Sequence, residues 1–195
     1  LQAALAGPFT SNGTQPPLVY PLEPQSVCSG CHGGMDSGHN IRPWTTWSGS
    51  MMAQATRDPL FWAALDVANN DLPDVGDFCL RCHTARGWLD GRTAPPLGSA
   101  DGCGLIGNID EDDNDFAGVE CSLCHRMVVN PSPPPGQQPV YYDNAQFWVS
   151  DEPCTPDIVP CNRGPYGYGA GWTEREVATV PKGRPGRRTN ATCLP

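Results

Sequence analysis

The chain has 195 residues, a length that predicts one domain or at most two small ones. Glycine and proline contribute 22 residues each and the net charge is −9, a balance that indicates disorder unless something other than an aliphatic core holds the chain together. The acidic charge argues against nucleic-acid binding, because phosphate binding needs a basic face, and we expect no membrane span, because no apolar run is long enough.

Ten cysteines offer the missing source of order, through cross-links or a bound cofactor. We expect a single domain over residues 1–195, made of an N-terminal arm (1–24), a cofactor-attachment region (25–129) and a Pro/Gly-rich C-terminal wrap with a basic tail (130–195). The first seven residues, LQAALAG, have neither a basic region nor a full apolar stretch. They therefore predict a processed, exported chain.

Six cysteines form three copies of one motif, C-x-x-C followed at once by histidine. The copies are Cys28-Ser29-Gly30-Cys31-His32, Cys79-Leu80-Arg81-Cys82-His83 and Cys121-Ser122-Leu123-Cys124-His125. This is the attachment motif of c-type haem. Residues i, i+3 and i+4 share one helical face, so two thiols can bond the porphyrin while the histidine reaches the iron. The sequence therefore predicts three covalent haems c, with His32, His83 and His125 as proximal ligands.

Three other readings explain less. Zinc sites take four ligands per metal and need no histidine directly after the second cysteine. A thioredoxin-like redox pair needs one motif near a β-α-β pattern, not three among Gly and Pro runs. A domain held by disulfides alone explains the even number of cysteines but not the three histidines.

In chain order, a helix is expected to begin at Asp58-Pro59, with Asp58 as N-cap, and to continue to Asn69. Its residues Phe61, Leu65 and Ala68 fall on one apolar stripe. Further short helices are expected over 76–84 and 118–128, because the attachment motif needs helical geometry. Residues 130–139 indicate a polyproline-like connector, and 141–143 with 147–149 a short hairpin. The expected fold is mostly irregular with a few short α-helices and little β structure, organised around stacked haems as its core.

The acidic run 108–115 places oxygen ligands at alternate positions, as calcium loops do. The calcium ligands would be Asp110, Asp112 and Asn114. The run is not an EF-hand, because Asp115 occupies the position of the invariant glycine. A solvated acidic loop is the alternative reading.

Four cysteines lie outside the motifs: Cys103, Cys154, Cys161 and Cys193. In an exported protein an even remainder indicates two disulfides, with three possible connectivities. We favour Cys154 with Cys161 and Cys103 with Cys193, and free thiols are the alternative.

The three motifs, with the segment WTTWSGSMMA at 44–53, resemble the multihaem c-type cytochromes, specifically extracytoplasmic proteins similar to the cytochrome c554 group. The segment is similar to the W-x-x-S-x-H-A element of that family, whose histidine is commonly a distal haem ligand. Met52 stands at the position of that histidine. Further likeness at 57–62, 79–88, 118–129 and 163–166 extends the resemblance over roughly residues 25–168.

The sixth ligands are less determined than the proximal ones. His39 is the one histidine outside the motifs, so it serves at most one iron. We expect His39 and, on the family position, Met52 as distal ligands, and we assign no sixth ligand to the third haem. The alternatives are a loop histidine and a methionine that packs a helix face. Methionine ligation raises a haem potential relative to histidine, so mixed ligation would spread the three potentials.

These expectations favour an extracellular or periplasmic electron-transfer protein, with a subunit of an extracellular cytochrome filament as one variant. Its acidic surface would suit basic redox partner proteins, or it would meet extracellular acceptors directly. The alternative is a multihaem redox enzyme, in which an iron without a sixth ligand reduces a small nitrogen or oxygen compound. A third reading is a domain in which the haems serve structure alone.

Overall fold

We describe the protein from a computed structural model. The structure describes residues 13–33, 42–105, 115–128 and 146–151, except for the side chain of Cys31. It describes only the backbone of 153–154, 159–160, 162–163 and 178–179.

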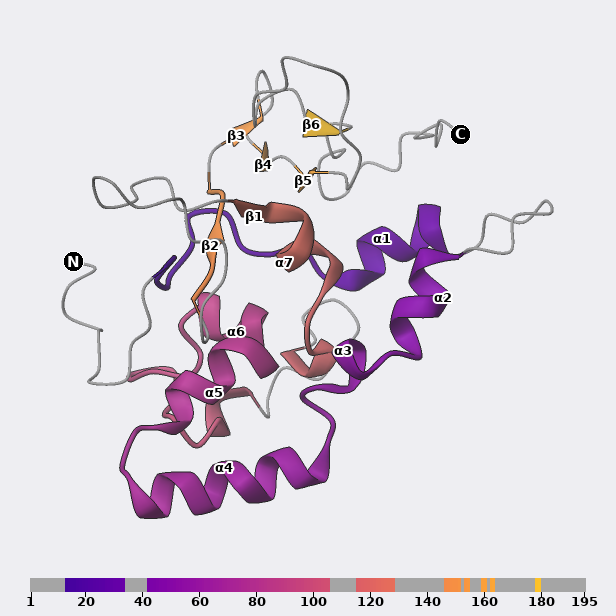
Figure 1. Ribbon diagram of the computed structural model, residues 1–195. Helices are drawn as coiled ribbons and strands as arrows, with labels where there is room; N and C mark the ends of the chain where they lie inside the picture. Colours follow the sequence, from indigo (N-terminus) through magenta and orange to yellow (C-terminus); the bar gives the residue numbers. More distant parts are fainter. Residues whose placement is uncertain are drawn as a thin grey trace, which may run out of the picture.

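Within these ranges the chain is mostly helical, with irregular connections and very short strands. The helices are α1 (Gln25–His32), α2 (Pro43–Ser48), α3 (Met51–Gln54), α4 (Pro59–Asp71), α5 (Gly76–His83), α6 (Ala85–Leu89) and α7 (Cys121–Arg126), with 3₁₀ turns η2 (Cys103–Leu105) and η3 (Asp115–Ala117). In Figure 1, α4 runs along the bottom, α5 and α6 lie above it, and α7 and α1 lie above these. The predicted short helices and small amount of β structure are confirmed, whereas the described residues are mostly helical and not mostly irregular.

The helix α4 forms as its sequence predicts. The Asp58 side chain accepts a hydrogen bond from the backbone N–H of Leu60 at 2.9 Å, and Pro59 occupies the first helical turn. Of the expected apolar stripe, Leu65 is buried and both Phe61 and Ala68 are half-buried. The helix therefore turns the predicted face toward the rest of the protein.

The third-motif helix, α7, is shorter than the predicted 118–128. Before it, Gly118 has a φ of +70°, and a Cβ there would lie 2.2 Å from the carbonyl oxygen of Met52. Only glycine tolerates both that angle and that approach. After it, Met127 takes extended backbone angles. The chain therefore turns into the helix only at Cys121.

Four short helices were given no range from the sequence: α1, which carries the first motif, and α2, α3 and α6. In α2, Pro43 occupies the first turn, and in α3 the Ser50 hydroxyl accepts a hydrogen bond from the backbone N–H of Ala53 at 3.4 Å. Helix α6 follows α5 after Thr84, and all five of its residues are buried. Helices of this length show too little periodicity to stand out in a sequence.

The strands are two residues long and pair antiparallel: β1 (Met127–Val128) with β2 (Trp148–Val149), β3 (Pro153–Cys154) with β4 (Val159–Pro160), and β5 (Asn162–Arg163) with β6 (Ala178–Thr179). The expected hairpin placed 147–149 against 141–143. Instead Val149 is opposite Met127 and Trp148 is opposite Val128. The partner of 148–149 is therefore the end of the third motif, while residues 141–143 lie outside the described ranges.

The described residues bury an apolar cluster of their own, although the composition predicted haems as the core. Its central members come from α5 and α6: Leu80 and Leu89 are fully buried and Trp88 is 2 % exposed. A fully buried leucine contributes roughly 1.5 to 3 kcal/mol relative to an exposed one. The cluster comprises Leu18, Leu22, Leu65, Leu80, Ala85, Trp88, Leu89, Leu105, Leu123, Phe147 and Val149.

Residues 13–24 of the expected N-terminal arm pack onto this body. The backbone N–H of Thr14 donates to the carbonyl of Phe147 at 2.9 Å. Arg126, at the end of α7, donates to the carbonyls of Tyr20 and Ser150, both at 2.8 Å. It thereby joins the arm to the segment that follows β2.

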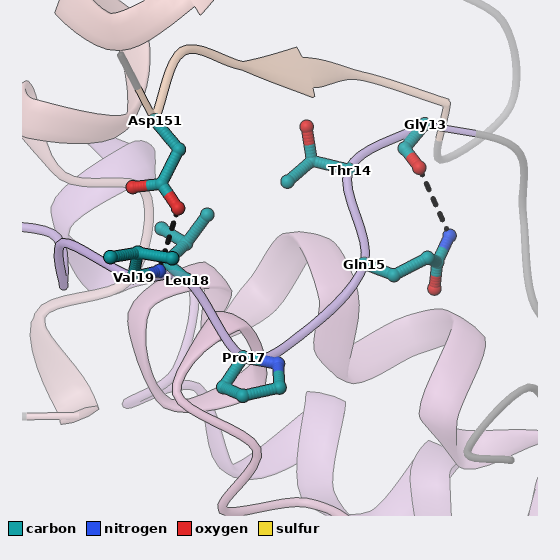
Figure 2. A pocket seen from close by; sticks show the side chains of 7 residues that line it. All are labelled: Gly13, Thr14, Gln15, Pro17, Leu18, Val19 and Asp151. Carbon is teal, nitrogen blue, oxygen red and sulfur yellow. Dashed lines mark hydrogen bonds between the residues drawn. The ribbon is translucent and has the colours of Figure 1, made fainter. Parts of the chain in front are cut away.

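A shallow hollow beside this arm is lined by 13–15, 17–19 and Asp151 (Figure 2). The Asp151 carboxylate accepts hydrogen bonds from the backbone N–H groups of Val19 and Tyr20, at 2.6 and 2.9 Å, and pairs with Arg126 at 3.2 Å. These bonds give Asp151 a structural role, as the anchor of the arm.

Candidate functional site

Each C-x-x-C-H motif lies on its own helix, as the attachment geometry requires. The first and second motifs end α1 and α5 at their histidines, and the third occupies most of α7. Cysteine and histidine of each motif therefore share one helical face. Among the described motif side chains no disulfide is formed, so Cys28, Cys79, Cys82, Cys121 and Cys124 are thiols.

His83 has the most closely defined surroundings. Its Nδ1 atom lies 2.9 Å from the carbonyl oxygen of Ala55. A carbonyl can only accept, so Nδ1 is the donor, and in the neutral imidazole Nε2 is then the nitrogen with the lone pair. Histidines that ligate metals generally hold their second ring nitrogen in this way. The arrangement fits a proximal haem ligand.

Aromatic and polar groups hold His83 in place. The Phe61 ring stacks on the imidazole with ring centroids 3.9 Å apart and planes 5° from parallel. The Thr56 hydroxyl donates to the carbonyl oxygen of His83, and the carbonyl of Thr56 accepts from Trp62 Nε1 at 2.6 Å. Helix α4 and the turn before it therefore orient the histidine of the second motif.

The thiols of the second motif are half-buried beside this histidine. Burial raises the pKa of both Cys79 and Cys82, although nearby Arg81 opposes the shift at Cys82. Both side chains are therefore neutral thiols at neutral pH.

Arg81 points into the core from between these two cysteines. Its guanidinium lies over the rings of Trp88 and Phe147, 4.3 and 4.4 Å from their centroids, and donates to the Phe147 carbonyl at 3.2 Å. Burial lowers the pKa of Arg81 to about 10, so it stays charged at neutral pH. The second motif thus contains a fixed, buried positive charge that its spacing did not indicate.

The first and third motifs meet through their leading cysteines. A hydrogen bond with the Cys28 thiol, followed by burial, raises the pKa of Cys121. Two tryptophans support this junction: the Trp44 ring lies close to Gly33 at the end of α1, and Trp47 Nε1 donates to the Val119 carbonyl at 2.7 Å. Two of the three attachment segments therefore lie side by side.

Met52 approaches the same junction from α3. Its carbonyl oxygen accepts from the backbone N–H of Val119 at 2.9 Å, two residues before Cys121, and its side chain is 49 % exposed. The structure thus brings the expected distal ligand close to the third motif in the fold. The rings of His32 and His125 are exposed.

Several predicted residues lie outside the described part of the chain: His39, the calcium ligands Asp110, Asp112 and Asn114, and the cysteines at 161 and 193. Asp115, which ends the acidic run, is described and buried. Its carboxylate binds Arg92 through two hydrogen bonds of 2.5 Å. The end of the run is therefore an internal ion pair, not a solvated loop.

One disulfide expectation differs from the structure. Cys103 was expected to pair with Cys193, but it carries a free, exposed thiol. The side chain of Cys154 is not among those described. The expected pairing was based on the even number of cysteines outside the motifs. That number carries no information about which side chains meet in space.

Sequence reasoning missed the residues that orient the motifs from elsewhere in the chain. Ala55 acts through its carbonyl, so its side chain leaves no signal. Thr56 and Glu120 are isolated polar residues in otherwise ordinary segments. Both are buried, at 0 % and 1 % exposed, and only the fold reveals this.

Across the ranges that the structure describes, no helix combines the length and apolar character needed to cross a membrane. The same ranges contain no group of three or more His, Cys, Asp or Glu side chains placed to hold a bare metal ion. A haem iron needs fewer protein ligands than a bare metal ion, because side chains bind only at its axial positions. No family model matches the chain, and neither a curated protein nor a solved structure matches it significantly.

Proposed function

We propose that the chain is a trihaem c-type cytochrome that transfers electrons outside the cytoplasm. Three cysteine pairs would hold the haems through thioether bonds, and His32, His83 and His125 would be the proximal iron ligands. The pairs are Cys28 with Cys31, Cys79 with Cys82 and Cys121 with Cys124. When bound, the haem iron supplies a one-electron redox couple.

The observation that carries this proposal is the geometry at His83. With Nδ1 held by the Ala55 carbonyl, Nε2 is the nitrogen available to a metal. Phe61 fixes the ring plane from one side and keeps water from that face. A disulfide reading of the motif gives no reason for this prepared imidazole. A zinc reading needs a group of three or more ligating side chains, which the described residues do not contain.

Two further features suit electron transfer. The contact between Cys28 and Cys121 places two attachment segments together, which favours closely spaced haems. The buried charge of Arg81, inside the second motif, favours the reduced form of a haem held there, because reduction removes a positive charge. The net charge of −9 favours basic partners, whose association should weaken with salt.

A reductive titration of the purified protein tests the proposal. We expect a mild reductant to reduce the haems reversibly and carbon monoxide to leave the reduced spectrum unchanged, because an electron carrier needs no open iron position. A spectrum shifted by carbon monoxide would contradict the electron-carrier function and favour the alternative, a redox enzyme with an open haem iron. Failure to accept electrons from any mild reductant would contradict both.

A further inference from the structure

Glu120 directly precedes Cys121 and is the N-cap residue of α7, yet its carboxyl forms no capping hydrogen bond. The residue is 1 % exposed, and neither carboxyl oxygen has a hydrogen-bond partner among the described residues. Ionising a buried carboxyl without partners costs free energy. Burial accordingly raises the pKa of Glu120 to about 8, which brings its titration close to neutral pH.

Charged and titratable groups face Glu120 from several elements. Arg86 of α6 attracts the carboxylate, whereas Asp115 of η3 and Asp90 after α6 oppose its ionisation; the Cys28 thiol of α1 also opposes it, until that sulfur is bound in a thioether. The single attraction is therefore weaker than burial and the opposing charges together.

The two aspartates have a cation of their own. Arg92 lies 2.5 Å from an oxygen of Asp115 and 2.9 Å from an oxygen of Asp90. Their charges are thus partly compensated within the fold. Glu120 is the carboxyl of this group that has no hydrogen bond to hold it in the ionised form.

Glu120 also faces two haem-attachment cysteines. Cys121 follows it directly in the chain, and Cys28 lies near enough to act on the carboxyl electrostatically as a thiol. The carboxyl lies five residues before the proposed iron ligand His125 in the sequence. It is therefore placed to respond to charge at the junction of the first and third motifs without ligating the iron itself.

We propose that Glu120 couples proton uptake to electron transfer, binding one proton from water when an electron enters the haem held at Cys121 and releasing it when the electron leaves. This inference rests on the proposed electron-transfer function. An electron from a one-electron donor removes one positive charge near the carboxyl, which makes the ionised carboxylate less favourable. The carboxyl O–H bond forms on reduction and breaks on oxidation, so one electron and one proton move together.

The test is a spectroscopic redox titration of the haem-loaded protein at pH values from about 6 to about 9. We expect one midpoint potential to fall as the pH rises, by up to about 59 mV for each tenfold decrease in proton concentration. In Glu120→Gln, which keeps the shape but cannot titrate, that dependence should be lost. Glu120→Asp should retain it.

Glu23→Gln is the matched control, since Glu23 is a half-buried carboxyl near the same helix. It should keep the dependence on pH. A wild-type potential independent of pH, or a dependence that persists in Glu120→Gln, would overturn the proposal, and the latter would assign the proton to haem propionates.

A second measurement needs no variant. Infrared difference spectra between the reduced and oxidised wild-type protein should contain a carboxylic C=O band that shifts in D₂O. Absence of any such band would also overturn the role of Glu120. Reversible reduction in the same samples reports separately on the electron-transfer function.

Discussion

The carbonyl oxygen of Ala55 lies 2.9 Å from Nδ1 of His83, so a backbone group four residues before the start of α4 fixes the tautomer of the second-motif histidine. The same imidazole stacks on the ring of Phe61, which lies in α4. The segment that joins α3 to α4 therefore prepares a histidine to bind a metal through Nε2.

Replacing Phe61 tests this support. Phe61→Leu keeps an apolar side chain but removes the stacked ring, and we expect it to lower the free energy of unfolding by about 0.5 to 1.5 kcal/mol and to shift the potential of one haem. Denaturant unfolding and a redox titration measure the two effects. Leu60→Ala, on the same helix at a residue 76 % exposed, should change stability by less than about 0.5 kcal/mol. Equal effects of the two variants would contradict a specific role for Phe61.

Met52 is expected to be a sixth ligand, and the neighbouring Met51 offers a matched control because its side chain is 90 % exposed. Met52→Ala should convert one haem from low to high spin, because the iron loses a ligand. Met51→Ala should leave the absorption spectrum unchanged. If Met52→Ala also keeps every haem low-spin, Met52 is not a ligand.

The close approach of the third motif to α3 depends on Gly118, which has a positive φ and no space for a Cβ. Alanine substitutions at three glycines distinguish the effects of these two constraints. Gly118→Ala combines an unfavourable φ of +70° with a Cβ 2.2 Å from the Met52 carbonyl oxygen, whereas Gly91 has a φ of +79° and open space around it. Gly30, inside α1, also has open space.

We expect Gly118→Ala to destabilise most, by more than the roughly 1 to 2 kcal/mol of left-handed strain that Gly91→Ala should show. Gly30→Ala should stabilise by about 0.5 to 1 kcal/mol, since alanine favours a helix interior. Unfolding midpoints of the three variants give the order. A Gly118→Ala protein as stable as Gly91→Ala would show that α3 and the third motif are not in close contact.

Glu120 should also make stability depend on pH. Burial raises its pKa in the folded chain from 4.5 to about 8, so between these values the folded state binds more protons than the unfolded state. The free energy of unfolding contributed by Glu120 therefore falls as the pH rises through this window, by on the order of 1 kcal/mol per pH unit.

Denaturant unfolding of the oxidised protein from about pH 5 to about pH 8 measures this slope. It should be smaller in Glu120→Gln and unchanged in Glu23→Gln. A slope that is the same in all three proteins would mean that Glu120 is not buried as described.

The sequence predicted the start of α4, because Asp58 and Pro59 are local signals of a helix start, but it placed the end at Asn69, two residues before Asp71. It also placed the motifs on helices, because their spacing is helical. It overestimated α7, whose limits depend on the contact between Gly118 and the Met52 carbonyl, 66 residues away in the chain. The partner of β2 and the ion pair of Asp115 with Arg92 are likewise long-range relationships. Local pattern carries no information about them.

The residues of the candidate site likewise divide into those that the sequence predicts and those that only the fold reveals. The attaching cysteines and the proximal histidines follow from motif spacing alone. The groups that orient or tune them, the Ala55 carbonyl, Arg81 and Glu120, come from packing between elements and are visible only in the fold.

The central claim is that three haems are covalently attached to this chain. The intact mass of the denatured protein tests it most directly, because thioether-bound haem survives unfolding whereas zinc and non-covalent cofactors are lost. We predict a mass equal to that of the chain plus three haems. A mass equal to that of the bare chain would contradict the cytochrome assignment and return the three motifs to metal or disulfide chemistry.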